Sequence, residues 1–199
     1  YLNEIIYDLN GSEGINATID GIDGIDSLYI NDVMIQKADY GFTSNVLTVP
    51  RNVIDNLGLS YGEHRIKIVS SGKNYVGKFT VVTKVIYTAE DLINLQVKYD
   101  NDANESNGYS YDGYFILNNN INAQGYTWNS IVKLDEQNPS KCGFKGIFDG
   151  RGYTIKNLQV LTDVICYGVF GGLAEGAVVK NVAFVGIGGN PSNNINHNM

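Results

Sequence analysis

The segment GYTIKNLQV, which starts at Gly152, returns 24 residues later as GAVVKNVAF, which starts at Gly176. Both copies place glycine, an aliphatic residue, Lys-Asn and two further apolar residues at matching positions. Short strand-like segments that recur at periods in the low twenties, with glycine at the corners, are typical of solenoids, in which one pass of the chain cannot bury its own apolar face. The repeat therefore predicts a parallel β-helix in the second half of the chain.

The repeat also predicts which residues stack. With 24 residues per pass, three apolar pairs are expected: Ile155 over Val179, Leu158 over Val182, and Val160 over Phe184. The asparagines Asn157 and Asn181 coincide in this alignment, and asparagine at a corner can bond its counterpart in the next pass to form a ladder.

A second alignment places FKGIFDG, from Phe144, over CYGVFGG, from Cys166. The longer segments FKGIFDGRGYTIKNLQV and YGVFGGLAEGAVVKNVAFVG, with the lead-in YFILNNNIN, resemble the GLUG-type right-handed parallel β-helix repeats of bacterial cell-surface proteins. The resemblance implies a secreted or surface-anchored protein whose solenoid is a spacer, an adhesin or a glycan-contacting surface. Pectin-degrading enzymes share the solenoid geometry, which is an analogy of fold alone.

Only about three such passes fit before the polar segment GIGGNPSNNINHNM. We therefore expect the chain to be a fragment of a longer protein, or its last pass to be covered by a partner or by self-association, because an uncovered end would aggregate. Tyr1 in place of methionine likewise leads us to expect that a leader or an upstream domain has been removed.

Residues 1–84 show strands of alternating apolar and polar residues, such as INATI, SLYIND, NVLTVP and EHRIKIV, with SSGKN as a hairpin turn. This pattern predicts a small antiparallel β-sandwich. Between two of the strands, one helical turn is expected to point Val53, Ile54 and Leu57 inward. The segment LTVPRNVIDNLGLSYGEHRIKIVSSG resembles the bacterial Ig-like modules of surface and polysaccharide-acting proteins from Gram-positive gut bacteria.

Near residue 85 the alternating strand pattern gives way to a helical pattern, which predicts a domain boundary. Residues 1–84 are then the Ig-like sandwich, and residues 85–199 are the start of the β-helix. Thr88 and Asp91 have the spacing of a helix capping box. They predict a short helix over residues 89–97, which would cap the open end of the solenoid. The fold class expected is all-β.

The charge balance narrows the choice of partners. The formal net charge is −7, which argues against nucleic acid and anionic membranes, because both require a basic face. No apolar run reaches the ~18 residues that a membrane-spanning helix needs.

Two acidic segments are candidate metal sites. Asp100, Asp102 and Asn104 alternate as calcium ligands do, but Glu105 and Tyr111 occupy positions that an EF-hand gives to glycine and glutamate, so a solvated loop is favoured. In IDGIDGID, Asp20, Asp23 and Asp26 lie three residues apart, and the two Asp-Gly steps are explained as turns, with calcium as the alternative. No other cofactor is expected.

A catalytic site is not expected. Glycoside hydrolysis needs two carboxylates across a cleft, whereas Asp149, Asp163 and Glu175 do not recur in register. Arg151, Lys156 and Lys180 could suit a lyase, which needs a base to abstract a proton next to a uronate carboxylate. However, Lys156 and Lys180 belong to the repeat itself, and a solvated face explains them. The two cysteines, Cys142 and Cys166, are expected to be free thiols, because diagonal neighbours are too far apart for a disulfide.

Aromatic residues gather around the expected cap and first pass: Tyr109, Tyr111, Tyr114, Tyr126 and Trp128. Exposed rings can stack on sugars or bind protein; the alternative is that they pack the cap onto the first pass. We hypothesise a non-catalytic surface protein for adhesion or glycan contact, with partners among glycans and surface proteins. The alternatives are an accessory part of a polysaccharide-degrading enzyme and a mechanical spacer.

Overall fold

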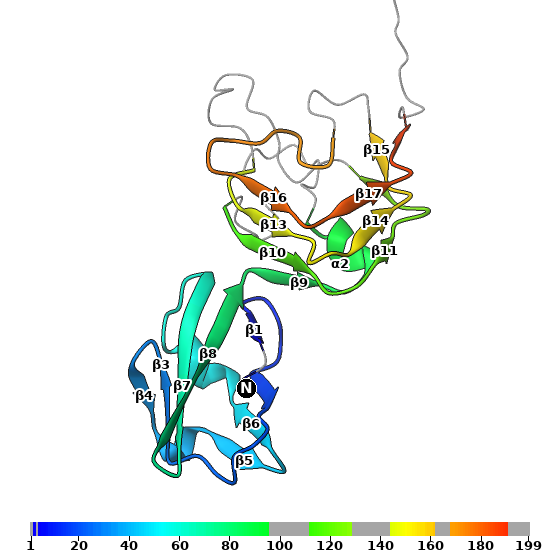
Figure 1. The fold of residues 1–199 in the computed structure, drawn as a ribbon. Coiled ribbons are helices and arrows are strands. Elements are labelled where there is room, and N and C mark those ends of the chain that lie inside the picture. The colour runs from blue at the N-terminus through cyan, green and yellow to red at the C-terminus, as the bar shows by residue number, and fades with distance from the viewer. Residues whose placement is uncertain (1, 3, 96–111, 129–143, 162–167, 191–199) are drawn as a thin grey trace, which may run out of the picture. The chain divides into compact units, whose positions relative to one another are not determined.

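The computed structural model describes residue 2 and residues 4–95, 112–128, 144–161 and 168–190 (Figure 1). The chain divides into two compact units, Tyr1–Lys84 and Val85–Met199, called here the first and second units. This division coincides with the boundary that the sequence predicts near residue 85. The structure is mostly strand with few helices, which confirms the all-β prediction.

The first unit contains two sheets around one core. One sheet has the order β1 (Ile5–Asp8), β8 (Lys73–Val82), β7 (Gly62–Ser70), β3 (Ser27–Ile30) and β4 (Val33–Ile35). The other has the order β2 (Ile15–Thr18), β6 (Val46–Val49) and β5 (Gly41–Thr43). Neighbouring strands are antiparallel in both sheets, with the exception of β1 and β8, which run parallel.

The alternating pattern of the first unit places its apolar residues as predicted. The inward residues of the four predicted strands are buried: Ile15, Ile19, Leu28, Ile30, Leu47, Val49, Ile66 and Ile68. The hairpin between β7 and β8 turns through Ser71 and Gly72, both with positive φ, as a tight two-residue turn of this hand requires.

Two short helical segments complete the first unit. The helix α1 (Arg51–Asp55) begins directly after Pro50. Its Ile54 is buried, and Val53 and Leu57 pack against the core, which confirms the predicted turn. A 3-10 turn, η1 (Lys37–Asp39), precedes β5.

The second unit contains three sheets, in which successive strands from β10 (Tyr114–Leu117) onward pair in parallel. The first sheet has the order β9 (Lys84–Ile86), β10 (Tyr114–Leu117), β13 (Ile147–Asp149) and β16 (Val178–Lys180). The second has β11 (Ile121–Asn122), β14 (Thr154–Lys156) and β17 (Ala183–Val185), and the third has β12 (Thr127–Trp128), β15 (Gln159–Leu161) and β18 (Gly188–Asn190). The chain visits the three sheets in the same order on each pass. Figure 1 shows β10, β13 and β16 side by side in the first sheet.

The register differs from the one that the 24-residue offset predicts. Ile155 pairs with Phe184, and Phe148 pairs with Val179. Val160 pairs with Gly189. The predicted stack of Ile155 over Val179 is therefore wrong, and paired residues of successive passes lie about thirty positions apart in the sequence.

The physical reason is that the repeated motif encodes a corner between two strands. Its first copy spans β14, Asn157 and β15, whereas its second copy spans β16, Asn181 and β17. Both asparagines have φ in the left-handed region, at 58° and 54°, which asparagine tolerates better than most residues. The two copies share a local backbone shape but occupy different corners.

The helix α2 (Ala89–Ile93) has the predicted capping box, in which Asp91 N donates to Thr88 Oγ1 and the Asp91 carboxylate accepts from Thr88 N. It ends at Ile93, earlier than predicted. Its Leu92 is fully buried in the core of the second unit.

A column of phenylalanines fills that core. Phe144 lies 6.0 Å from Phe115 and 5.4 Å from Phe170, between ring centroids. Phe170 also contacts Phe148 at 5.4 Å and Phe184 at 6.4 Å. In the last pass, Leu173, Val178 and Val185 are exposed.

The register can be tested by cross-linking. In a chain whose native cysteines are replaced by serine, the paired exposed residues Lys156 and Val185 are changed to cysteine. Adjacent parallel strands lie about 4.8 Å apart, within the Cα spacing of a disulfide, so Lys156→Cys/Val185→Cys should cross-link fully on mild oxidation.

The matched control, Lys156→Cys/Lys180→Cys, joins the equivalent positions of the two motif copies and should stay reduced. Mass spectrometry reads the outcome, and preferential cross-linking of the control pair would contradict the register.

Candidate functional site

Several residues that the sequence singles out lie outside the described part of the chain. They are the calcium candidates Asp100, Asp102 and Asn104, the tyrosines Tyr109 and Tyr111, Asp163, and the two cysteines Cys142 and Cys166.

Trp128 is fully buried, with no exposed surface, in the core of the second unit. It lies on β12 opposite Val160, and its Nε1 donates a hydrogen bond to the carbonyl oxygen of Val169 at 2.9 Å. A ring in this position cannot stack on a ligand, so the prediction that Trp128 is a binding residue is wrong and its packing alternative applies. This bond gives the indole N–H the hydrogen-bond acceptor that a buried tryptophan requires.

Two further candidate tyrosines, Tyr114 and Tyr126, lie in described residues, near strands of the first and third sheets. Tyr114 begins β10 and is half-buried. Tyr126 is 39% exposed, just before β12. The structure therefore does not bring these two together with Trp128 in one binding surface.

The IDGIDGID segment is a turn region in which the isoleucines are buried and the acids are exposed. Ile22 and Ile25 belong to the core of the first unit, whereas Asp20, Asp23 and Asp26 face solvent. Among the described residues, no three His, Cys, Asp or Glu side chains come close enough to hold a metal ion. The turn interpretation accounts for this segment.

A polar corner lies where each pass of the second unit leaves the first sheet. It collects polar or aromatic residues from successive passes: Tyr87, Asn118, Asn119, Asn120, Arg151 and Asn181. Tyr87 follows β9, the asparagine run follows β10, Arg151 follows β13, and Asn181 follows β16.

Side chains of the polar corner bond from one pass to the next. Asn119 Nδ2 donates to the carbonyl oxygen of Tyr87 at 3.1 Å. Arg151 Nη1 donates to Asn118 Oδ1 at 3.4 Å. These bonds run along the stacking direction, so they hold successive corners in line with one another.

Asp149, the last residue of β13, is the buried acid beneath this corner. Its Oδ1 accepts from the backbone N–H of Arg151 at 2.9 Å and from Asn181 Nδ2 at 3.0 Å. Its Oδ2 lies 3.3 Å from Lys180 Nζ. Burial disfavours the ionised form, but these donors outweigh it and hold the pKa of Asp149 below its ordinary value.

The predicted ladder between Asn157 and Asn181 does not form. Asn157 Nδ2 donates to Asn122 Oδ1 at 3.0 Å, at the corner between the second and third sheets. Asn181 donates instead to Asp149. Each asparagine bonds the preceding pass at its own corner, because the two motif copies lie at different corners.

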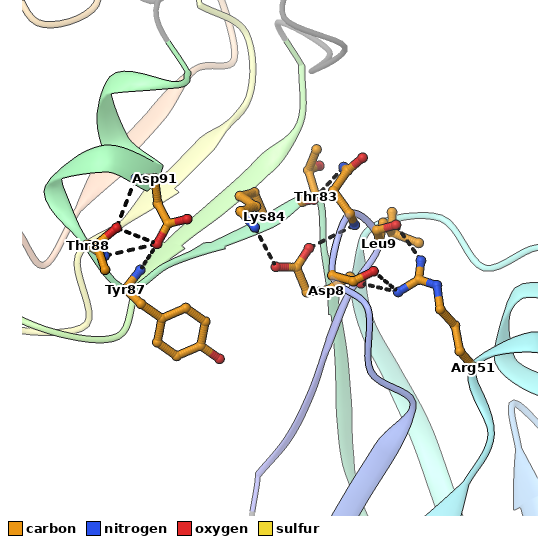
Figure 2. Close-up of polar contacts among 10 residues, drawn as sticks. Asp8, Leu9, Arg51, Thr83, Lys84, Tyr87, Thr88 and Asp91 are labelled. Carbon is orange, nitrogen blue, oxygen red and sulfur yellow. Dashed lines mark hydrogen bonds and ion pairs between the residues drawn. The ribbon is translucent and has the colours of Figure 1, made fainter.

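The polar corner offers the groups that a sugar requires. The Tyr87 side chain is 49% exposed, and Figure 2 shows its ring turned away from the Thr88 and Asp91 contacts. Asn119, Arg151 and Asn181 are also exposed. An accessible aromatic face beside amide and guanidinium donors can stack on a sugar ring and bond its hydroxyls.

Sequence reasoning missed Tyr87, and it considered Arg151 only as a group that could suit a lyase. The signal that could have indicated the polar corner is the run Asn118 to Asn120 directly after a buried strand, because such a run marks a solvent-facing corner.

Comparisons of the chain with protein-family models, with curated proteins and with solved structures found no match. Within the residues described, no helix is long and apolar enough to cross a membrane.

We predict that Asp149→Ala lowers the free energy of unfolding of the second unit by about 1–3 kcal/mol, because it removes the two hydrogen bonds and the ion pair that this buried carboxylate makes. The only tryptophan, Trp128, lies in this unit, so its fluorescence during urea unfolding measures the loss. The exposed Glu175 provides a control, since Glu175→Ala should change stability by no more than about 0.5 kcal/mol. Equal effects of the two substitutions would contradict this role of Asp149.

The stability that Asp149 supplies should also depend on pH. Its folded pKa lies below the unfolded value of about 3.9, so the unfolded chain takes up the proton first as pH falls. The stability difference between the natural chain and Asp149→Asn should therefore be complete above about pH 5 and shrink as pH falls through the folded pKa. A difference that grows below pH 4 would have the wrong sign.

Proposed function

We propose that this chain is a non-catalytic, extracellular or surface-anchored module that contacts glycans through the polar corner of its second unit. In this proposal the first unit is an Ig-like module, and the second unit is the helix-capped beginning of a right-handed parallel β-helix.

Two features support the proposed fold. Each of the three sheets gains a strand per pass in a constant order, which is how a β-helix grows. The first unit has two sheets around one core with short hairpin connections, which is the plan of a small β-sandwich.

The observation that carries the proposed function is the exposed Tyr87 ring at the head of the polar corner. The ring, at 49% exposed, begins a line of asparagine and arginine side chains that repeats along the stacking direction. A polymer of sugars also repeats along one direction, so a line of similar donors can contact several residues of the polymer at once.

A second group of tyrosines is part of the proposal. Tyr114 begins β10, Tyr126 directly precedes β12, and Tyr109 and Tyr111 precede β10 in the sequence. The acidic segment with Asp100, Asp102 and Asn104 adds calcium as a proposed ligand. Surface proteins and the exposed last pass of the chain itself are further proposed partners.

The test is retention of the purified chain on plant and mucin polysaccharides, with and without calcium, while released sugar ends are assayed. Tyr87→Ala should weaken retention about tenfold, because a stacking contact contributes about 1.4 kcal/mol. Tyr126→Ala tests the second group of tyrosines. Val76→Ala, at an exposed residue of the first unit, should leave retention unchanged.

The alternatives give different results in the same experiment. Release of sugar ends would indicate a catalytic chain and overturn the proposal. The absence of retention on every polysaccharide would favour the spacer, and retention that is lost with Tyr126→Ala alone would move the site away from the polar corner.

A further inference from the structure

The first unit is entered and left through two strands that lie side by side. Its first strand, β1, pairs with its last strand, β8, from Ile5 opposite Phe79 to Asp8 opposite Val82. The pair is the one parallel contact among the described strands of this unit. Strand direction decides how such a pair responds to tension.

A load applied through both ends of the unit pulls the two strands in opposite directions along their length. The chain enters at the start of β1 and leaves at the end of β8, and these lie at opposite ends of the pair. The bonds between the strands are then loaded together, in shear. In an antiparallel terminal pair, the same load would act at one end and break the bonds one at a time.

Contacts beyond the strands extend this pair (Figure 2). The backbone N–H of Leu9 donates to the carbonyl oxygen of Val82 at 2.9 Å. Asn10 Nδ2 donates to the carbonyl oxygen of Thr83 at 2.7 Å. Each bond joins the turn after β1 to the segment that leaves the unit, so both must break before the strands can slide.

An ion pair joins the same two segments. Lys84 Nζ lies 3.7 Å from Asp8 Oδ2, and the two side chains are only 18% and 15% exposed. Limited exposure reduces screening by water and salt, so this pair is stronger than a typical surface pair.

Arg51 holds the turn after β1 against the body of the unit. Its guanidinium donates to the carbonyl oxygens of Asp8 at 3.1 Å, Leu9 at 2.6 Å and Gly11 at 2.6 Å. Since Arg51 belongs to α1, the turn cannot follow the departing strand without breaking these bonds.

The Arg51 guanidinium is itself held in place by Asp55. Its Nε lies 3.2 Å from Asp55 Oδ2, and the Tyr7 hydroxyl donates to Asp55 Oδ1 at 2.6 Å. Burial, together with this hydrogen bond, raises the pKa of Tyr7, so the hydroxyl keeps its proton and remains a donor.

From these contacts we infer that the first unit is a load-bearing module, in which β1, β8 and the turn that Arg51 holds form a mechanical clamp. The function is to keep the chain folded while tension passes through it. This inference concerns residues Tyr1–Lys84 and does not rest on glycan binding by the second unit.

Single-molecule pulling on the full-length chain tests the clamp. The native cysteines are replaced by serine, one handle is attached at the N-terminus, and the other is attached at Glu90→Cys or at Lys78→Cys. Glu90 lies beyond the end of β8 and is exposed, so this handle loads the pair in shear. Lys78 is exposed and adjacent to Phe79, opposite the start of β1, so this handle pulls both strands from one end.

We expect the rupture force with the Glu90 handle to be at least about twice that with the Lys78 handle, since several bonds share the load in shear. Equal forces in the two geometries would overturn the inference.

A side-chain variant separates the clamp from general stability. Asn10→Ala removes the bond to Thr83, and Asn52→Ala, at an exposed asparagine of α1, is its matched control. Asn10→Ala should lower the force with the Glu90 handle and leave the force with the Lys78 handle unchanged, while the control changes neither. A loss of force in both geometries, or in neither, would contradict the clamp.

Discussion

The second unit depends on a constraint of parallel pairing: none of its described strands pairs with another strand of its own pass. The strand β14, for example, bonds β11 from the pass before and β17 from the pass after. Buried backbone groups must be paired. Each corner therefore has to place the next strand in register with the strands of the neighbouring passes, so that its backbone groups can bond to theirs. The left-handed asparagines and the bonds of Asp149 are the means by which the corners do this. The phenylalanine column and the exposed polar corner follow from that alignment.

Local features of this chain could be predicted from its sequence, and the pairing of distant segments could not. A few adjacent residues determine each local feature. Examples are the capping box of Thr88 and Asp91 and the turn at Ser71 and Gly72. The 24-residue repeat is local in the same sense, because it encodes a corner and does not specify which strand lies above it. The burial of Trp128 depends on β15 as its neighbour, and composition carries no information about that neighbour.

Charged side chains in the two units perform the same task with opposite sign. In the first unit, Arg51 donates to carbonyl oxygens of the turn where β1 ends. In the second unit, the carboxylate of Asp149 accepts from donors where β13 ends. Arg51 bonds three backbone carbonyl oxygens, whereas Asp149 bonds one backbone N–H together with the side chains of Asn181 and Lys180. In both cases, one partly buried charge holds several groups where a strand ends.

The pairing of β1 with β8 also determines when the first unit can fold during synthesis. The hairpin of β7 and β8 is local in sequence, whereas Ile5 can pair only after Phe79 has been synthesised. Until Val82 has left the ribosome, β1 has no strand to join, and its buried residues Ile5 and Tyr7 remain uncovered. Contacts between such distant residues form slowly and leave apolar surface open to misassociation. Among the strands of this unit, β1 is therefore made first and is among the last to pair.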